Sequence, residues 1–186
     1  MDIFVRDLAA TTTSRVSVST AGAQGDGDSQ RSSISSDGRY IAFDSYSENF
    51  VSDELKGTPN VFVHDREVGT TTLVSATPEL SPSDGVSVGP KISADGGSIA
   101  YRSTSADLVV GGSDPNNGFQ VFVYDRETAS TILVSAASAT NEAVESTEEV
   151  AISADGGVIS YTGFGFGTVW SDPLPSADIY VWVRRS

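Results

Sequence analysis

Two short segments recur along this 186-residue chain at a nearly constant spacing. The first reads Ile-Ser-x-Asp-Gly, and its copies begin at Ile34, Ile92 and Ile152. The second reads Val-Phe-Val-x-Asp or a close variant, and its copies begin at Ile3, Val61, Val121 and Ile179. Successive copies of either segment lie 58 or 60 residues apart. A fixed period of this kind is typical of repeat architectures, in which each unit buries its apolar face against its neighbours.

Within each copy the side chains alternate with a period of two, which is the period of a β-strand. In the run from Val61 to His64 the two valines face one side, and Phe62 and His64 face the other. Asp37 and Gly38 supply the turn chemistry of a tight hairpin, because glycine reaches the positive φ that closes it. No stretch with helix caps is present. Each period therefore predicts four short antiparallel strands.

The Ser-x-Asp-Gly hairpin, the Ile-Ala-Phe strand, the Val-Phe-Val-x-Asp-Arg strand and the Thr-rich strand ending in Leu-Val-Ser resemble the repeat of TolB-type, WD-like β-propellers. The resemblance covers nearly the whole chain. Together with the repeat period of ~60 residues, it implies an all-β fold of about three four-stranded antiparallel blades, which is a partial or half propeller. Such repeats occur in binding proteins, scaffolds and non-catalytic domains of peptidases, so the resemblance implies a fold and leaves the activity open. A β-sandwich is the alternative fold.

The repeats predict a single domain over residues 1–186, divided at approximately 1–30, 31–88, 89–148 and 149–186. The first unit would hold only the third and fourth strands of a blade, and the last only the first three. Closure of a propeller usually takes at least about four blades. Two copies arranged head to tail would form a ring of about six blades, and a fragment of a longer single-chain propeller is the alternative.

The chain carries 11 Lys and Arg against 25 Asp and Glu, a formal net charge of −14. This charge argues against a nucleic-acid partner, because duplex binding depends on cationic side chains. No run approaches the ~18 apolar residues of a membrane helix, so membrane insertion is not expected. The opening residues lack the profile of a secretory signal. The acidic, cysteine-free composition is nevertheless typical of bacterial secreted proteins, and we expect an extracellular or periplasmic location with a protein or glycan partner.

Short hairpins should emerge on one face of the propeller, and long connections near residues 44–60, 103–120 and 162–178 on the other. Long loops are the usual seat of binding. Many acidic residues fall in or beside the long connections, which predicts a negative loop face. They are Asp26, Asp28, Asp44, Glu48, Asp53, Glu54, Glu79, Asp84, Asp107, Asp114, Glu142, Glu145, Glu148, Glu149, Asp172 and Asp178.

Three of these loops offer the oxygen-rich sets that calcium prefers. Asp26 and Asp28 lie two residues apart in a glycine-rich loop. Asp53 is followed by another acid, and Asp114 lies close to Asn116. None of the loops matches an EF-hand. The alternative interpretation is a solvated acidic loop that uses Asp and Gly for turn geometry.

Two series of aspartates recur once per repeat, which favours a structural role in the blade. We expect their carboxylates to cap the amides of turns. The hairpin series comprises Asp37, Asp95 and Asp155, each followed by a glycine: Gly38, Gly96 and Gly156. The strand-end series comprises Asp7, Asp65 and Asp125, and Val183 replaces it in the last copy.

Catalytic chemistry finds little support in the composition. One histidine and no cysteine nearly exclude a zinc site, and a Ser-His-Asp triad would have to use His64, which we expect to be a partly exposed strand residue. A glycosidase needs a pair of carboxylates, which the many acids do not exclude. Sialidase-like catalysis needs an arginine cluster, and Arg102 is nearly alone near the loop face. The sequence favours a non-catalytic binding or scaffold module; a propeller hydrolase, or an accessory propeller of a larger enzyme, is the alternative.

An aromatic, glycine-punctuated stretch in the last long loop contains Phe164, Phe166 and Trp170. Aromatic rings stack on sugars and peptides, which makes this stretch, together with Arg102, a candidate ligand site. The alternative is that the rings plug the open end of the array.

Overall fold

The computed structural model describes residues 1–186 except 53–54, 111–117, 136–144, 165–176 and 185–186. Every regular element in these described ranges is a β-strand. The strands are β1 (Phe4–Asp7), β2 (Thr12–Arg15), β3 (Ser29–Ile34), β4 (Tyr40–Ser45), β5 (Asn60–Asp65), β6 (Thr70–Leu73), β7 (Ser87–Ile92), β8 (Ser98–Ser103), β9 (Gln120–Asp125), β10 (Ser130–Leu133), β11 (Glu145–Ile152), β12 (Val158–Phe164) and β13 (Ala177–Val183).

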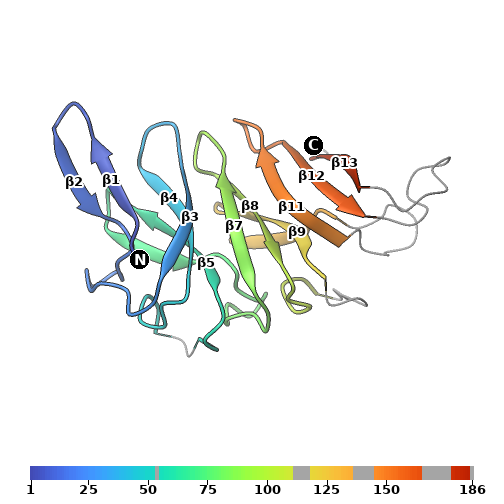
Figure 1. Ribbon diagram of the computed structural model, residues 1–186, viewed down its shortest axis with the longest axis horizontal. Helices are drawn as coiled ribbons and strands as arrows, with labels where there is room; N and C mark the ends of the chain where they lie inside the picture. Colours follow the sequence, from blue (N-terminus) through green and yellow to red (C-terminus); the bar gives the residue numbers. More distant parts are fainter. Residues whose placement is uncertain (53–54, 111–117, 136–144, 165–176, 185–186) are drawn as a thin grey trace.

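The strands form four antiparallel sheets in which neighbours in the sheet are also neighbours in the sequence. Their orders are β1-β2, β3-β4-β5-β6, β7-β8-β9-β10 and β11-β12-β13. The sheets stand side by side as blades, with β3, β7 and β11 in successive positions along the array (Figure 1). The all-β, partial-propeller prediction is confirmed, and the sandwich alternative is wrong because the apolar faces meet blade by blade. The division into repeats at residues 30, 88 and 148 stays a prediction.

The core is divided into layers between successive blades, as the repeat pattern requires. One layer joins Val61 and Val63 of β5 to Ile99 and Tyr101 of β8. The layer one blade later has the same arrangement, with Val121 and Val123 of β9 packed against β11 and β12. The layer nearest the N-terminus adds an aromatic group, in which the rings of Phe43, Phe50 and Phe62 lie 5.2–6.0 Å apart. Each blade therefore buries one face against its neighbour.

The same hydrogen bonds close the first hairpin of each blade. In the second of the three hairpins, Asp95 Oδ1 accepts bonds from Ser93 Oγ at 2.5 Å and from the N–H of Gly97 at 2.9 Å. The glycine between them, Gly96, has a φ of +74°, in the left-handed region that favours glycine. Asp37 and Asp155 bind the equivalent groups, and Gly38 and Gly156 have φ values of +73° and +68°.

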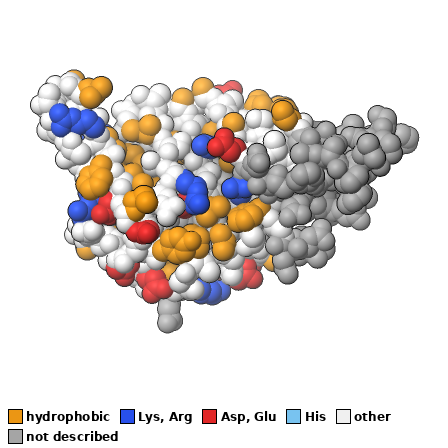
Figure 2. Space-filling view, in the orientation of Figure 1, with side chains coloured by type: hydrophobic (Ala, Val, Ile, Leu, Met, Phe, Trp, Pro, Cys, Tyr) orange, Lys and Arg blue, Asp and Glu red, His pale blue; other side chains and the backbone are white. Residues whose placement is uncertain are grey.

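The short hairpins and the long connections lie at opposite ends of the blades (Figure 1). The connections after β2, β4, β6 and β8 gather at the lower edge of the view, and several Asp and Glu side chains line this edge (Figure 2). In the part of the chain that the structure describes, no helix is long and apolar enough to cross a membrane.

Candidate functional site

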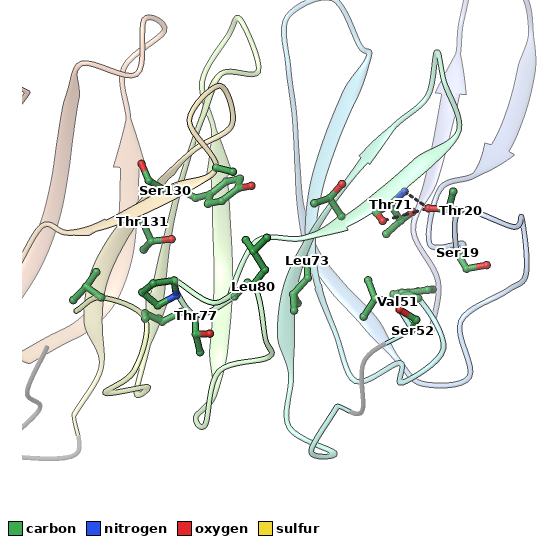
Figure 3. A pocket seen from close by; sticks show the side chains of 18 of the residues that line it. Ser19, Thr20, Val51, Ser52, Thr71, Leu73, Thr77, Leu80, Ser130 and Thr131 are labelled. Carbon is green, nitrogen blue, oxygen red and sulfur yellow. Dashed lines mark hydrogen bonds between the residues drawn. The ribbon is translucent and has the colours of Figure 1, made fainter. Parts of the chain in front are cut away.

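A groove of about 980 Å³ runs between the outer strands of the two complete blades. Its walls come from β6 and β10, from the connections that follow β2 and β6, and from the loops between β4 and β5 and between β8 and β9. Figure 3 shows Thr71 and Leu73 at one wall, Thr131 at the other, and Leu80 between them. The groove therefore crosses from one repeat to the next.

The lining of the groove is mainly apolar and uncharged. Its buried lining includes Phe50, Leu73 and Leu108, whereas Leu80 and Val110 line it with side chains that are 65% and 88% exposed. Among the described residues that line it, none is Asp, Glu, His, Lys or Arg. A concave apolar surface of this size is typical of binding sites.

Leu80 holds an unfavourable backbone conformation. Its φ is +62°, in a turn where the Leu80 N–H donates to the carbonyl of Thr77 at 2.8 Å. The equivalent position one repeat earlier is Gly22, which has a φ of +79° and donates to the carbonyl of Ser19 at 2.8 Å. A leucine in the left-handed region costs of order 1 kcal/mol relative to glycine. The strained residue is thus an exposed leucine at the rim of the groove.

The two outer strands differ in how their edges are covered. At β6, the Thr71 N–H donates to Thr20 Oγ1 at 3.0 Å, and Thr20 Oγ1 donates to the Thr71 carbonyl at 3.4 Å. Thr131 of β10 pairs with Tyr124 as Thr71 pairs with His64, so its N–H and carbonyl also point away from the sheet. The residue equivalent to Thr20 is Pro78, which has no hydroxyl group. Among the described residues, nothing replaces the missing bonds at Thr131.

The sequence did not predict this groove, although two departures from the repeat mark it. Pro78 replaces Thr20, and Leu80 replaces Gly22, within one connection whose other turn bonds are retained. Both departures lie in the lining of the groove. Both departures can be read from a position-by-position comparison of the repeats, where they stand among other differences in the same connection, such as Pro82 in place of Gln24.

The strand-end aspartates bind the turns that follow them. Asp65 Oδ1 accepts the N–H groups of Glu67 and Val68 at 2.9 and 3.4 Å, and Asp125 Oδ1 accepts the equivalent pair in its own turn. Asp7 Oδ1 accepts one such bond, from the Ala10 N–H at 2.8 Å. Asp65 also forms a bidentate pair with Arg39, with distances of 2.7–3.1 Å. The hydrogen bonds from Arg39, supported by the turn amides, lower the pKa of Asp65 to about 2.

This shift predicts a stability that depends on pH. Because the pKa of Asp65 is lower in the folded chain than in the unfolded chain, ionised Asp65 stabilises the fold above about pH 4, and this contribution is lost as the pH falls toward 2. In Arg39→Gln the free energy of unfolding should fall less steeply over this range, as measured by urea unfolding at a series of pH values. Equal slopes for the two proteins would contradict the prediction.

The predicted calcium residues are only partly described. Asp26 Oδ1 accepts the Glu48 N–H at 2.8 Å, and the carboxylate of Asp28 forms an ion pair with the amino group of Met1. Asp84, one repeat after Asp26, accepts the Ala106 N–H in the same way at 3.3 Å. No group of three or more Asp, Glu, His or Cys suited to a metal occurs in the described ranges. Asp53, Asp114 and Asn116 lie outside the described residues, and calcium binding stays a prediction.

The candidate ligand residues do not meet in one described site. Phe164 is the last residue of β12, and Phe166 and Trp170 lie outside the described ranges. Arg102 on β8 places its guanidinium carbon 5.1 Å from the centre of the Phe119 ring. The structure therefore shows no joint site for Arg102 and the aromatic stretch within its described part.

Two expectations about single residues are wrong. His64 is not partly exposed: it is 6% exposed, its Nδ1 lies 2.9 Å from Thr71 Oγ1, and burial lowers its pKa. Asp44 does not belong to the negative loop surface, because it is 1% exposed within β4. It accepts a bond from Arg31 at 3.0 Å and one from the Gly89 N–H at 2.9 Å. Alternation along a strand does not show how deeply the neighbouring blade and loops cover a polar side chain.

No family model and no curated protein matches this chain. Among solved structures it is similar to TolB from Acinetobacter baumannii, with a TM-score of 0.51 and 17% identity over 98% of this chain and 35% of that one. It is also similar to a putative TolB from Agrobacterium tumefaciens, with a TM-score of 0.51 and 16% identity over 84% of this chain and 46% of that one. An oligogalacturonate lyase in complex with manganese has a TM-score of 0.51 and 14% identity to this chain, over 97% of this chain and 40% of the lyase.

The chain thus spans less than half the length of each of these proteins. Identities this low show a shared fold and carry no activity across. The sequential four-stranded sheets and the Ser-x-Asp-Gly hairpins nevertheless agree with these likenesses over nearly the whole chain. The chain has the TolB-type β-propeller fold, and its blades make up part of such a propeller.

Proposed function

We propose that this chain is a non-catalytic binding module that holds an extended segment of a protein partner in the groove between β6 and β10. The observation that carries the proposal is the edge of β10 at Thr131, which no described residue covers and which lies beside an apolar groove of about 980 Å³. An extended peptide satisfies both features at once. Its backbone bonds to a strand edge, and alternate side chains enter the apolar surface.

The exposed rim supports the same conclusion. Leu80 keeps a large apolar side chain at the position where the preceding repeat has Gly22, in spite of its backbone strain. Backbone strain of this kind clusters at active sites and ligand-binding sites. A partner that covered Leu80 and Val110 would bury apolar surface that the free chain exposes.

The charge of the chain favours a basic partner. The net charge of −14 raises the local concentration of cationic segments and speeds their encounter. The bound segment would therefore carry apolar side chains for the groove and basic residues at its flanks. The proposal also includes calcium bound at Asp26 and Asp28, a glycan as an alternative ligand, and a location outside the cytoplasm.

A hydrolase is the competing function, and one of the similar structures is a lyase. General acid–base catalysis requires a titratable side chain within hydrogen-bond reach of the substrate. The described lining offers hydroxyl, amide and apolar groups, with Tyr124 as its only ionisable residue, and burial raises the pKa of that phenol. This chemistry favours binding over turnover at the groove.

The test uses Leu80→Gly, which separates binding from folding. Glycine relieves the positive φ and should raise the melting temperature, while removal of the side chain should weaken binding about tenfold, the expected loss for one well-buried leucine contact. Segments that bind the native chain are selected from a random peptide display library, and their Kd values are measured by fluorescence anisotropy.

Val68→Gly is the matched control, because Val68 is 62% exposed but lies on the β5–β6 turn outside the groove. It should leave the peptide Kd unchanged. Selected peptides whose Kd is the same for Leu80→Gly and for the native chain would place binding elsewhere. A library that yields no binder would also count against the proposal.

A further inference from the structure

The hairpins between the first two strands of each blade are joined by a directional row of backbone hydrogen bonds. The Ser36 N–H donates to the Ala94 carbonyl at 2.8 Å, and the Ala94 N–H donates to the Ala154 carbonyl at 2.9 Å. Among the described residues, the Ser36 carbonyl receives no bond and the Ala154 N–H donates none. The row therefore ends with an acceptor at one end of the array and a donor at the other.

The packing of the turn glycines also differs between the two ends of the array. Gly96 packs on the ring of Tyr40, and Gly156 packs on Ser98, which is the equivalent residue of the next blade. The next equivalent residue is Val158, which is 37% exposed, whereas Ser98 is 5% exposed. At the other end, nothing comes within 3.4 Å of a Cβ placed at Gly38. The array thus presents an uncovered turn glycine at its start and an uncovered strand residue at its end.

Equivalent residues show how much apolar surface a following blade covers. Val121 and Val123 of β9 are both 0% exposed, because the third blade covers them. Their counterparts on β13, Ile179 and Val181, are 77% and 63% exposed. Ile34 at the other end is 51% exposed, whereas Ile92 in the same position of the next blade is 7% exposed. Both ends therefore present the surface that an interior interface buries.

We propose that a second copy of this chain docks head to tail on these ends and closes a ring of about six blades. The Ala154 N–H of one copy donates to the Ser36 carbonyl of the other, and Val158 receives the other copy's Gly38. Two such contacts related by a two-fold axis continue the hairpin row around the ring. This assembly does not depend on the groove, which lies between the two complete blades.

In the closed ring, β13 of one copy and β1 of the other would compete for the same position, next to β2 in the sheet. The number of residue pairs that each strand forms indicates which one keeps it. Ile3, which precedes β1, and Val5 of β1 occupy the repeat positions of Ile179 and Val181 of β13. β13 forms seven pairs with β12, whereas β1 forms four pairs and only with β2. In the closed ring β13 keeps its place, its Ile179 carbonyl accepts the Val16 N–H of the other copy, and β1 is displaced. The Val16 N–H now donates to the Ile3 carbonyl at 2.9 Å.

Cysteine pairs test the contact directly, because the native chain has no cysteine. A chain with Ser36→Cys and Ala94→Cys serves as the reference, because it places the thiols across an existing link of the hairpin row. Ser36→Cys and Ala154→Cys are then made in separate chains, mixed and oxidised. In the mixture, a disulfide should join one chain of each kind, and it should form at a rate similar to that of the disulfide within the reference chain. A mixture that stays unlinked while the reference closes would overturn the proposal.

Light scattering gives a second measurement that needs no cross-link. The native chain should show the mass of two copies, and added salt should strengthen association because each copy carries a charge of −14. Val181→Asp should reduce the mass to one copy, and Val68→Asp, at a similarly exposed site away from the ends, should not. A single-copy mass at all concentrations, a mass that grows beyond two copies, or a dimer unaffected by Val181→Asp would each contradict the closed ring.

Discussion

Gly96→Ala should destabilise the fold by about 3 kcal/mol, because a backbone penalty and a steric clash act together. An alanine Cβ at this position would lie 2.4 Å from Cδ2 of Tyr40 and 3.1 Å from its Cγ. The ring cannot easily move, since the guanidinium carbon of Arg126 lies 3.7 Å from its centre and that of Arg39 lies 4.8 Å from it. Urea unfolding followed by circular dichroism measures the loss.

Gly38→Ala is the matched control for this effect. The φ of Gly38 is +73°, against +74° for Gly96, but the nearest atom to its Cβ position is Arg66 Nη1 at 3.7 Å. Both variants are measured in the single-copy Val181→Asp chain, so that no second copy contacts Gly38, and only the backbone penalty of about 1 kcal/mol then applies to Gly38→Ala. If the two variants lost the same free energy of unfolding, the packing of the turn glycine on the preceding blade would contribute nothing to stability.

Phe62→Ala should be at least as damaging, with a loss of about 3–5 kcal/mol. Phe62 is 0% exposed, and its ring contacts Phe43 in a stacked arrangement and Phe50 edge to face. The deletion removes the apolar transfer energy of a large ring and leaves a cavity that the rigid strands β4 and β5 cannot close. A chemical denaturation midpoint well below that of the native chain is the expected result.

Ile132→Ala offers the comparison, because Ile132 is 41% exposed on the outer strand β10. Its loss should stay below about 1 kcal/mol, since exposed side chains give up little transfer energy. Phe50 also lines the groove, so Phe62→Ala should weaken peptide binding as well, through the ring that Phe62 supports. A Phe62→Ala protein as stable as Ile132→Ala would show that the aromatic group is not part of the cooperative core.

The repeat pattern was sufficient to predict the fold, because its physical causes are local. Alternation specifies which residues of β5 and β9 face the next blade, and Asp-Gly specifies the hairpins, whatever lies further along the chain. Two residues illustrate the limit of such local reasoning. His64 and Asp44 follow the same alternation as their neighbours, yet both are buried. Gly89 of the next blade bonds Asp44, and the Thr71 hydroxyl beside His64 donates to the Val18 carbonyl.

The sequence by itself determined the strands, their order within each blade and the acidic character of the chain, since each depends on local residue type and count. Only the tertiary structure decided where a partner could bind. The groove exists because the connection after β6 crosses to β10 of the next blade, where Pro78 offers no hydroxyl to the edge at Thr131 and no other described residue covers it. That juxtaposition joins residues 53 positions apart. It depends on how two blades pack, which the pattern within one repeat does not contain.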